Sequence, residues 1–409
     1  MSVQTEIDRI ITAVGAAYDA VEAKGGTAPA AQTIEGIAGA ISGIKSAPTT
    51  PYMETEYVAV GEGDSNTSHY IKRAKLYNHT AIYAYEFAMQ DQLQNLDFSD
   101  ASNNITAIEP EAFQRAQVTG IVLPNTISVL EVACFSSAFI ATLIVPPLVT
   151  VLPMEAFSNI MPVHNNETGE ALPINIILPQ NLTKIEDSCF TGAQITQLTI
   201  PDTVTEIGYG TFEYCGDLAS ITLPLGLQKI SNRMFAGCMS LTSITIPAAV
   251  TEIGTEAFYD SGLTSITIPA TVTALGSKAF YECQGLTHMN IQANVTVIPD
   301  FFAQECPLTS LILPNTVQTI GESAFERIQK LQITELTIPA SVIFIGANAF
   351  NSNNATQMTL TVLPTTPPTF GGPAFNLATG SVIKVPAASV AAYKAADGWK
   401  EYESYIVAM

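Results

Sequence analysis

Six cysteines and four histidines carry the most versatile chemistry in this chain of 409 residues, since thiolates and imidazoles serve as metal ligands, nucleophiles and bases. Their spacing fits none of these roles, because the sequence has no CxxC pair, no HExxH and no GxSxG. The histidines are His69, His79, His164 and His288. We therefore expect no catalytic site, no metal site and no cofactor, and hence no enzymatic activity.

The cysteines instead keep a fixed distance from phenylalanines. Three lie three residues after a phenylalanine, one lies four residues after, and two lie immediately before. In that order they are Cys215, Cys238 and Cys283, then Cys306, then Cys134 and Cys189. Because a thiol behaves as a small apolar group, this pattern predicts free thiols buried inside a repeating structure.

A repeated phrase shows what that structure is. LTSITIP occurs at Leu241–Pro247 and at Leu263–Pro269, and LTSLILP occurs at Leu308–Pro314. Prolines recur about every 22–23 residues, within the leucine-rich-repeat range, and phenylalanines keep the same period from Phe87 to Phe375. A unit of this length buries its apolar face only against its neighbours, so the chain is predicted to be a repeat solenoid.

One unit, Leu241–Gly262, shows the expected path of the chain. Its first residues alternate between apolar and polar and end at a proline, which predicts a short strand. After a bend, a short helical or 3₁₀ return carries Phe258 into the core. Stacked units are therefore expected to form a parallel β-sheet on one face of the solenoid.

The recurring AF dipeptide with a trailing cysteine, as in KAFYECQG, stands in phase with LxxIxIP. This pattern resembles the BspA-type leucine-rich repeats of bacterial surface proteins, over roughly Tyr70–Met409. The resemblance implies a leucine-rich-repeat solenoid with an adhesive or recognition role, and it implies no enzymatic residues.

The composition excludes several classes of protein. Hydrophobic residues make up 47% of the chain and charged residues 13%, which is enough for a continuous core. A net charge of −21 repels phosphate backbones, so nucleic-acid binding is not expected. The charge is explained by solubility of a long solenoid, by binding of divalent cations or by repulsion from an anionic partner, although no D-x-D-x-D-G calcium loop occurs.

The first 46 residues differ in kind from the repeats. Apolar residues at heptad a and d spacing predict an amphipathic helix over Thr5–Lys24, and a glycine-containing helix follows it. The heptad residues are Ile7, Ile10, Val14, Ala17 and Val21. Because two short helices bury too little surface alone, this segment is expected to self-associate, for example as a trimer, or to dock on another protein.

No secretory signal and no membrane-spanning segment are predicted. The stretch Glu6–Ile44 resembles the short N-terminal modules of phage virion proteins. That resemblance implies contacts with other virion subunits and release by lysis. A helical cap for the solenoid is the alternative interpretation.

The predicted organisation has four parts. Residues 1–46 form the helical segment, 47–69 a linker and irregular cap, 70–380 the solenoid of about 13 turns, and 381–409 a C-terminal cap. Trp399 is expected to seal the core at that end rather than to bind a partner. Phe157 and Phe190 are 33 positions apart, which predicts an insertion near residues 159–170, either a functional loop or a tolerated one.

A candidate binding face follows from the strand period. One position of each predicted strand points outward, apolar in the first turns and mostly hydroxyl-bearing afterwards. The candidate residues are Val122, Ile144, Ile177, Thr199, Thr222, Thr245, Thr267 and Asn290, and the column continues through Ile312, Thr337, Val362 and Lys384. Threonine is also simply a good strand residue, so β-propensity is the competing explanation.

These observations predict a non-enzymatic phage virion protein of the tail-fibre, head-fibre or decoration type. Its N-terminal helices would join other virion subunits, and its solenoid would bind a host-surface protein or glycan. A bacterial cell-surface adhesin, extracellular or surface-bound, is one alternative. A purely structural decoration protein is the other.

Overall fold

The computed structural model describes residues 52–60, 68–90, 93, 95–118, 121–164, 168–330 and 332–409. The chain divides into two compact units, described separately below: unit 1 comprises residues 1–81 and 95–105, and unit 2 comprises residues 82–94 and 106–409. The predicted helices of residues 1–46 lie outside the described residues. Within the described part of the chain, no helix is both long enough and apolar enough to cross a membrane.

Unit 1 contains a three-stranded sheet. Strands β1 (Tyr52–Val60) and β2 (Ser68–Tyr77) form an antiparallel pair with a register shift between Glu56 and Tyr57, and β4 (Asn95–Asp97) runs parallel to β2. The sequence predicts a linker and an irregular cap over residues 47–69. Within that range the structure has a regular strand, β1, and the beginning of β2.

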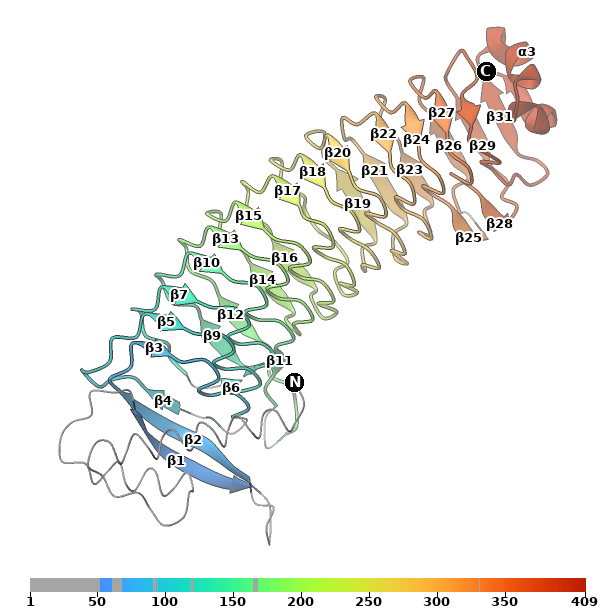
Figure 1. Cartoon of the computed structure of the whole chain (residues 1–409). Coiled ribbons are helices and arrows are strands. Elements are labelled where there is room, and N and C mark those ends of the chain that lie inside the picture. The colour runs from blue at the N-terminus through green and yellow to red at the C-terminus, as the bar shows by residue number, and fades with distance from the viewer. Residues whose placement is uncertain are drawn as a thin grey trace, which may run out of the picture. The chain divides into compact units, whose positions relative to one another are not determined.

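Unit 2 belongs to a parallel β-solenoid of about 14 turns, the predicted fold (Figure 1). Most turns contribute one strand to row A, at the position of the repeat that LTSITIP occupies, but the segments around Val122 and Thr245 are not strands, in contrast to the strand predicted from Leu241. Row A consists of β9 (Thr142–Ile144), β12 (Asn175–Ile177), β14 (Gln197–Thr199), β16 (Ser220–Thr222), β19 (Ser265–Ile268), β21 (His288–Ile291), β23 (Ser310–Ile312), β26 (Glu335–Ile338), β29 (Thr359–Val362), β31 (Val382–Val385) and β32 (Ile406–Ala408).

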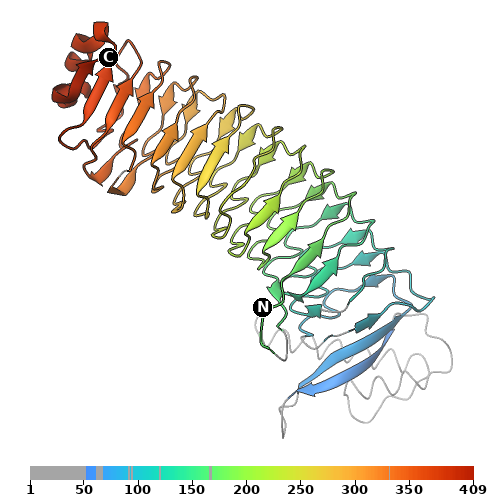
Figure 2. The same cartoon turned by 180° about the vertical axis from the view of Figure 1, so that it is seen from behind.

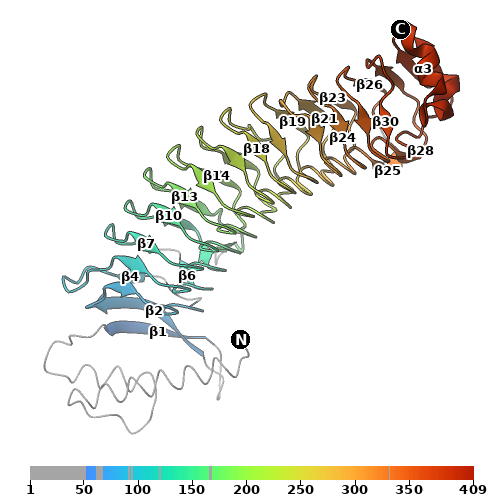
Figure 3. The same ribbon diagram turned by 45° about the horizontal axis from the view of Figure 1, so that its top comes forward.

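Row B carries the second, two-residue strand of each turn and lies beside row A, as views from both sides show (Figures 1 and 2). Row B consists of β3 (Ala81–Ile82), β5 (Ala107–Ile108), β7 (Val129–Leu130), β10 (Val151–Leu152), β13 (Lys184–Ile185), β15 (Glu206–Ile207), β17 (Lys229–Ile230), β18 (Glu252–Ile253), β20 (Ala274–Leu275), β22 (Val297–Ile298), β24 (Thr319–Ile320), β27 (Phe344–Ile345) and β30 (Thr369–Phe370). The stacked turns of unit 2 bend gradually along its length (Figure 3).

A third set of short strands occurs in some turns only. This set consists of β6 (Gln117–Val118), β8 (Phe139–Ile140), β11 (Met161–Pro162), β25 (Arg327–Lys330) and β28 (Ser352–Asn354). The predicted insertion follows β11, where His164 and Ala171 form an antiparallel bridge and Leu172 N–H donates to Val163 O at 2.7 Å.

The returns that carry the phenylalanines are turns rather than the helical or 3₁₀ segments that the sequence predicts. Residues two before and two after the phenylalanine adopt left-handed backbone conformations, for example Glu111 at φ 56° and Arg115 at φ 58°. Alternate amides then point to the next turn, where Phe113 N–H donates to Cys134 O at 2.8 Å. The backbone N–H and C=O groups of these segments therefore form their hydrogen bonds with the next turn of the solenoid, and not within a helix.

The phenylalanine rings form a continuous column inside unit 2. Neighbouring rings stack nearly in parallel, as for Phe113 and Phe135 with centroids 5.0 Å apart, and Phe212 and Phe235 at 5.6 Å. These side chains are completely buried. Their stacking fixes the register between turns, because each ring packs against the rings above and below.

One turn reverses the usual Ala-Phe order. Phe280 N–H donates to Phe302 O, whereas Phe258 N–H donates to Ala279 O, so Phe302 occupies the alanine position and Ala303 the phenylalanine position. The Phe302 ring consequently packs edge-on, at 76° to Phe280 and 82° to Phe325. Cys306 lies three residues after Ala303, so its apparent offset of four in the sequence reflects this reversal.

All six cysteines are buried and free, as the sequence predicts. Several thiols donate to a carbonyl of the preceding turn, as Cys215 Sγ does to Phe190 O at 3.0 Å and Cys306 Sγ to Phe280 O at 2.9 Å. Burial raises the pKa of Cys215 to about 12 and raises the pKa of Cys134 and Cys238 as well. Cys134, Cys215 and Cys238 are therefore unreactive packing residues.

The C-terminal end of unit 2 is covered by η1 (Ala387–Ser389), α3 (Val390–Ala395) and η2 (Trp399–Tyr405). Trp399 is fully buried and its Nε1–H donates to Pro368 O at 2.7 Å. The predicted sealing role of Trp399 is confirmed, because its apolar ring is enclosed while its polar nitrogen has a partner.

Candidate binding surfaces

The predicted binding column lies on the outward face of row A. Val122 has 80% of its surface exposed, Ile144 59% and Ile177 44%. The residues immediately before and after each of them are buried. Thr199, Thr222, Thr245 and Thr267 are exposed, and Asn290 is half-buried. The alternation follows from strand geometry, which points successive side chains to opposite faces.

Strand pairing brings these residues together in small groups. Ile144 lies opposite Ile177, Thr199 opposite Thr222, and Thr267 opposite Asn290. Val122 lies in the turn before that of Ile144, because it falls between Phe113 and Phe135 in the sequence. The three apolar residues thus occupy consecutive turns.

The column continues beyond Asn290 with one change of register. Asn290 lies opposite Ile312, which is 56% exposed. Thr337 lies opposite Thr361, not opposite the predicted Val362, which is buried. The prediction counted back from Pro364 and is wrong by one position, because this turn has one more residue between the strand and its proline than the preceding turn has. The predicted oligomerisation residues Ile7, Ile10, Val14, Ala17 and Val21 lie outside the described residues.

A charged cluster on the return side of the solenoid was not singled out from the sequence. Arg233 pairs with Glu213 at 2.6 Å and with Glu256, and its guanidinium lies 5.9 Å from the centroid of the Tyr259 ring. The Tyr259 hydroxyl donates to Glu282 at 3.0 Å, and burial together with this bond raises the pKa of Tyr259 to about 12. Because the Arg233 guanidinium binds one carboxylate on the preceding turn and one on the following turn, the cluster braces neighbouring turns.

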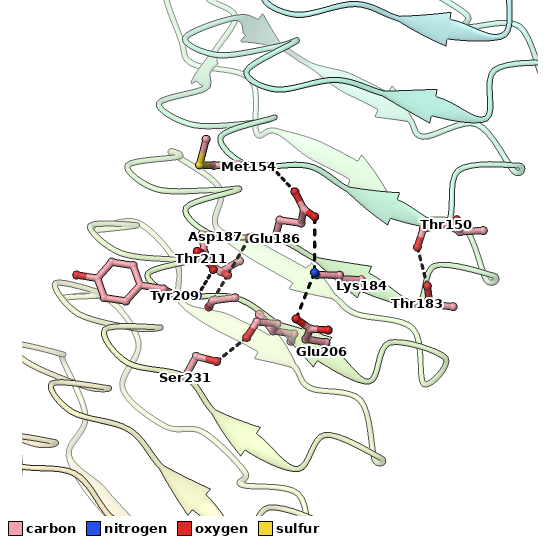
Figure 4. Close-up of polar contacts among 12 residues, drawn as sticks. Thr150, Met154, Thr183, Lys184, Glu186, Asp187, Glu206, Tyr209, Thr211 and Ser231 are labelled. Atoms are coloured by element: carbon pink, nitrogen blue, oxygen red, sulfur yellow. Dashed lines mark hydrogen bonds and ion pairs between the residues drawn. The ribbon is translucent and has the colours of Figure 1, made fainter.

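A groove of about 340 Å³ lies between the turns that contain β15 and β17. Strand β15 ends one three-stranded sheet of row B, and β17 begins the next. Within the sheets of row B a backbone amide also links successive turns just after the paired strands, as Gly254 N–H does to Ile230 O at 2.8 Å. Here the Ser231 hydroxyl donates to Ile207 O instead (Figure 4).

Polar groups in the groove are held by backbone bonds. Asp187 Oδ1 accepts from Tyr209 N–H at 2.7 Å, and Asn232 Oδ1 accepts from Thr255 N–H at 2.9 Å. Gly208 is required beside Asp187, because a Cβ there would lie 2.3 Å from the carboxylate. The Tyr209 ring projects outward at the rim and is 45% exposed (Figure 4).

The lysines near the groove are neutralised. Lys184 lies 3.3 Å from Glu206 and 3.6 Å from Glu186 (Figure 4), and Lys229 lies 2.8 Å from Glu252. Sequence reasoning missed the groove entirely. The sequence feature that could have indicated the groove is a single residue, because Ser231 occupies the position that is Gly208 and Gly254 in the adjoining turns.

Comparisons with solved structures found other leucine-rich-repeat proteins. A leucine-rich repeat protein from Bacteroides ovatus is 19% identical, with a TM-score of 0.47, over 87% of this chain and 98% of that one. A leucine rich cell surface protein from Faecalibacterium prausnitzii is 20% identical, with a TM-score of 0.39, over 70% and 81%. No match was found among curated proteins.

The comparison with protein families is decisive for identity. The model of the BspA type leucine rich repeat region matches residues 66–164, 171–262 and 251–379, in six copies. These matches cover most of the chain and coincide with the stacked turns described above. The chain therefore belongs to the BspA-type leucine-rich-repeat family.

Proposed function

We propose that this chain is a non-enzymatic recognition protein whose row A face binds a host-surface protein or glycan. The observation that carries the proposal is the exposed apolar patch of Val122, Ile144 and Ile177 in three consecutive turns. Contiguous apolar surface of this kind marks interaction sites in soluble proteins. The exposed threonines that continue the column supply hydrogen-bonding groups at the margin of the contact.

The proposed carrier is a phage particle, with residues 1–46 joining the chain to other virion subunits as a homo-oligomer. The support for this part is the heptad spacing from Ile7 to Val21. Display on a bacterial cell surface is the competing location, and it would use the same row A face.

The recognition proposal is tested with the labelled full chain and a panel of bacterial strains, scored by flow cytometry. Val122→Glu combined with Ile144→Glu should weaken cell binding at least tenfold, because two charges enter an apolar contact, and about 1.4 kcal/mol already corresponds to tenfold. Leu225→Glu combined with Met239→Glu is the matched control, because both are similarly exposed apolar residues that lie outside the column. Equal binding by the double variant and wild type, or no bound strain, would contradict the proposal.

The carrier is tested by quantifying the chain in purified particles and in the cell-envelope fraction by mass spectrometry. Enrichment in particles supports the virion role, and enrichment in the envelope supports the adhesin. Light scattering then compares the full chain with a variant lacking residues 1–46. The full chain should be oligomeric and the truncated chain monomeric, whereas two monomers would refute the heptad prediction.

A further inference from the structure

We propose that the groove between β15 and β17 is a binding site for a neutral saccharide unit. The groove lies on row B, so the site does not depend on the partner proposed for row A. Its volume of about 340 Å³ falls within the ~300–1,000 Å³ typical of small-molecule sites.

The electrostatics exclude charged ligands. Both nearby lysines are neutralised by glutamates, and the chain carries a net charge of −21, so an anion would find no free positive partner. A hard divalent cation prefers six to eight oxygen ligands. Among the residues that the structure describes, no three His, Cys, Asp or Glu side chains are grouped to hold a metal ion.

The remaining groups suit a ring that carries several hydroxyls. Asp187 keeps a second carboxylate oxygen as an acceptor, and Asn232 keeps an NH₂ group as a donor, after each uses one oxygen for a backbone bond. Those backbone bonds fix both side chains before any ligand binds, which lowers the entropic cost of binding. A purely apolar ligand would leave these groups unpaired.

Tyr209 supplies the apolar component. Its ring stands at the rim of the groove, partly exposed, and presents an apolar face with a hydroxyl at one end. A sugar ring has the complementary character, with C–H groups on its faces and hydroxyls around its edge. The groove therefore combines a platform with fixed donors and acceptors at the row B junction between β15 and β17, where the Ser231 hydroxyl donates to Ile207 O.

The test is saturation-transfer NMR on the full chain with glucose, galactose, mannose and N-acetylglucosamine, and with sialic acid as an anionic comparator. At least one neutral sugar should give a signal and sialic acid should not. Tyr209→Ala should reduce the signal at least fivefold, and Tyr209→Phe should retain it because the ring face remains. Tyr214→Ala is the matched control, a 57% exposed tyrosine outside the groove lining.

Three results would overturn the site: no signal from any neutral sugar, an undiminished signal in Tyr209→Ala, or an equal loss in Tyr214→Ala. Unchanged thermal unfolding of the variants shows that a lost signal is not a lost fold. The variant Val122→Glu with Ile144→Glu should keep the sugar signal. The saccharide site and the row A proposal can therefore fail separately.

Discussion

The phenylalanine column inside the solenoid and the outward column of row A repeat with the same period, yet they differ in how strictly they repeat. Inside, nearly every turn presents a phenylalanine, and each ring packs against two others. Outside, the equivalent position holds valine, isoleucine, threonine, asparagine or lysine. Interior packing thus restricts the residue type, whereas an exposed strand position only has to suit an extended backbone.

The largest expected difference comes from replacing one residue of each column by alanine, at positions close to each other along the solenoid. Phe157→Ala should lower the free energy of unfolding by about 3–5 kcal/mol, because it leaves a cavity between two stacked rings. Ile144→Ala, on the outside, should change it by no more than about 0.5 kcal/mol. Urea denaturation of both variants gives the two values. Equal losses would mean that the exterior column is also part of the core.

The reversed turn offers a second test of the interior column. Phe302→Ala should cost about 3–5 kcal/mol, since it removes a buried ring. Adding Ala303→Phe returns the usual Ala-Phe order, and the double variant should lie within about 1.5 kcal/mol of wild type. If the double variant is no more stable than Phe302→Ala alone, the ring position assigned to Ala303 is incorrect.

The smallest expected effect concerns the charged cluster, which joins turns without a buried ring. The pKa of Tyr259 is raised to about 12 in the folded protein, from about 10 in the unfolded chain. The protonated hydroxyl therefore makes its full contribution to the free energy of unfolding at pH values below the unfolded-state pKa. That contribution is lost as the pH rises through the pKa of Tyr259 in the folded protein. Tyr259→Phe should therefore show a weaker loss of stability between these two pH values in thermal melts. Parallel curves for both proteins would show that the hydroxyl contributes nothing.

Much of the fold could be predicted from spacing alone. The period of the prolines and phenylalanines indicates stacked turns, and the offsets of Cys215 and Cys238 place their thiols inside. The outward position of Ile144 follows from strand alternation. These predictions succeed because they depend on residues within one repeat.

Other features depend on contacts between turns and escaped prediction. Ala303 occupies the ring position only because the backbone bonds of that turn are shifted by one residue relative to the phenylalanine. Val362 is buried because strand pairing, and not the distance to Pro364, sets its register. The left-handed backbone conformation of Glu111 could not be predicted from the residue type, because glutamate rarely adopts it.

The sequence by itself determined the architecture, the family, the buried thiols and the outward column, because a repeat specifies its own neighbours. Only the tertiary structure decided where that regularity is interrupted. The groove beside Gly208 lies where β15 and β17 do not pair and the Ser231 hydroxyl bridges the two turns. Such an interruption is a relation between two turns in space, and neither turn records it alone.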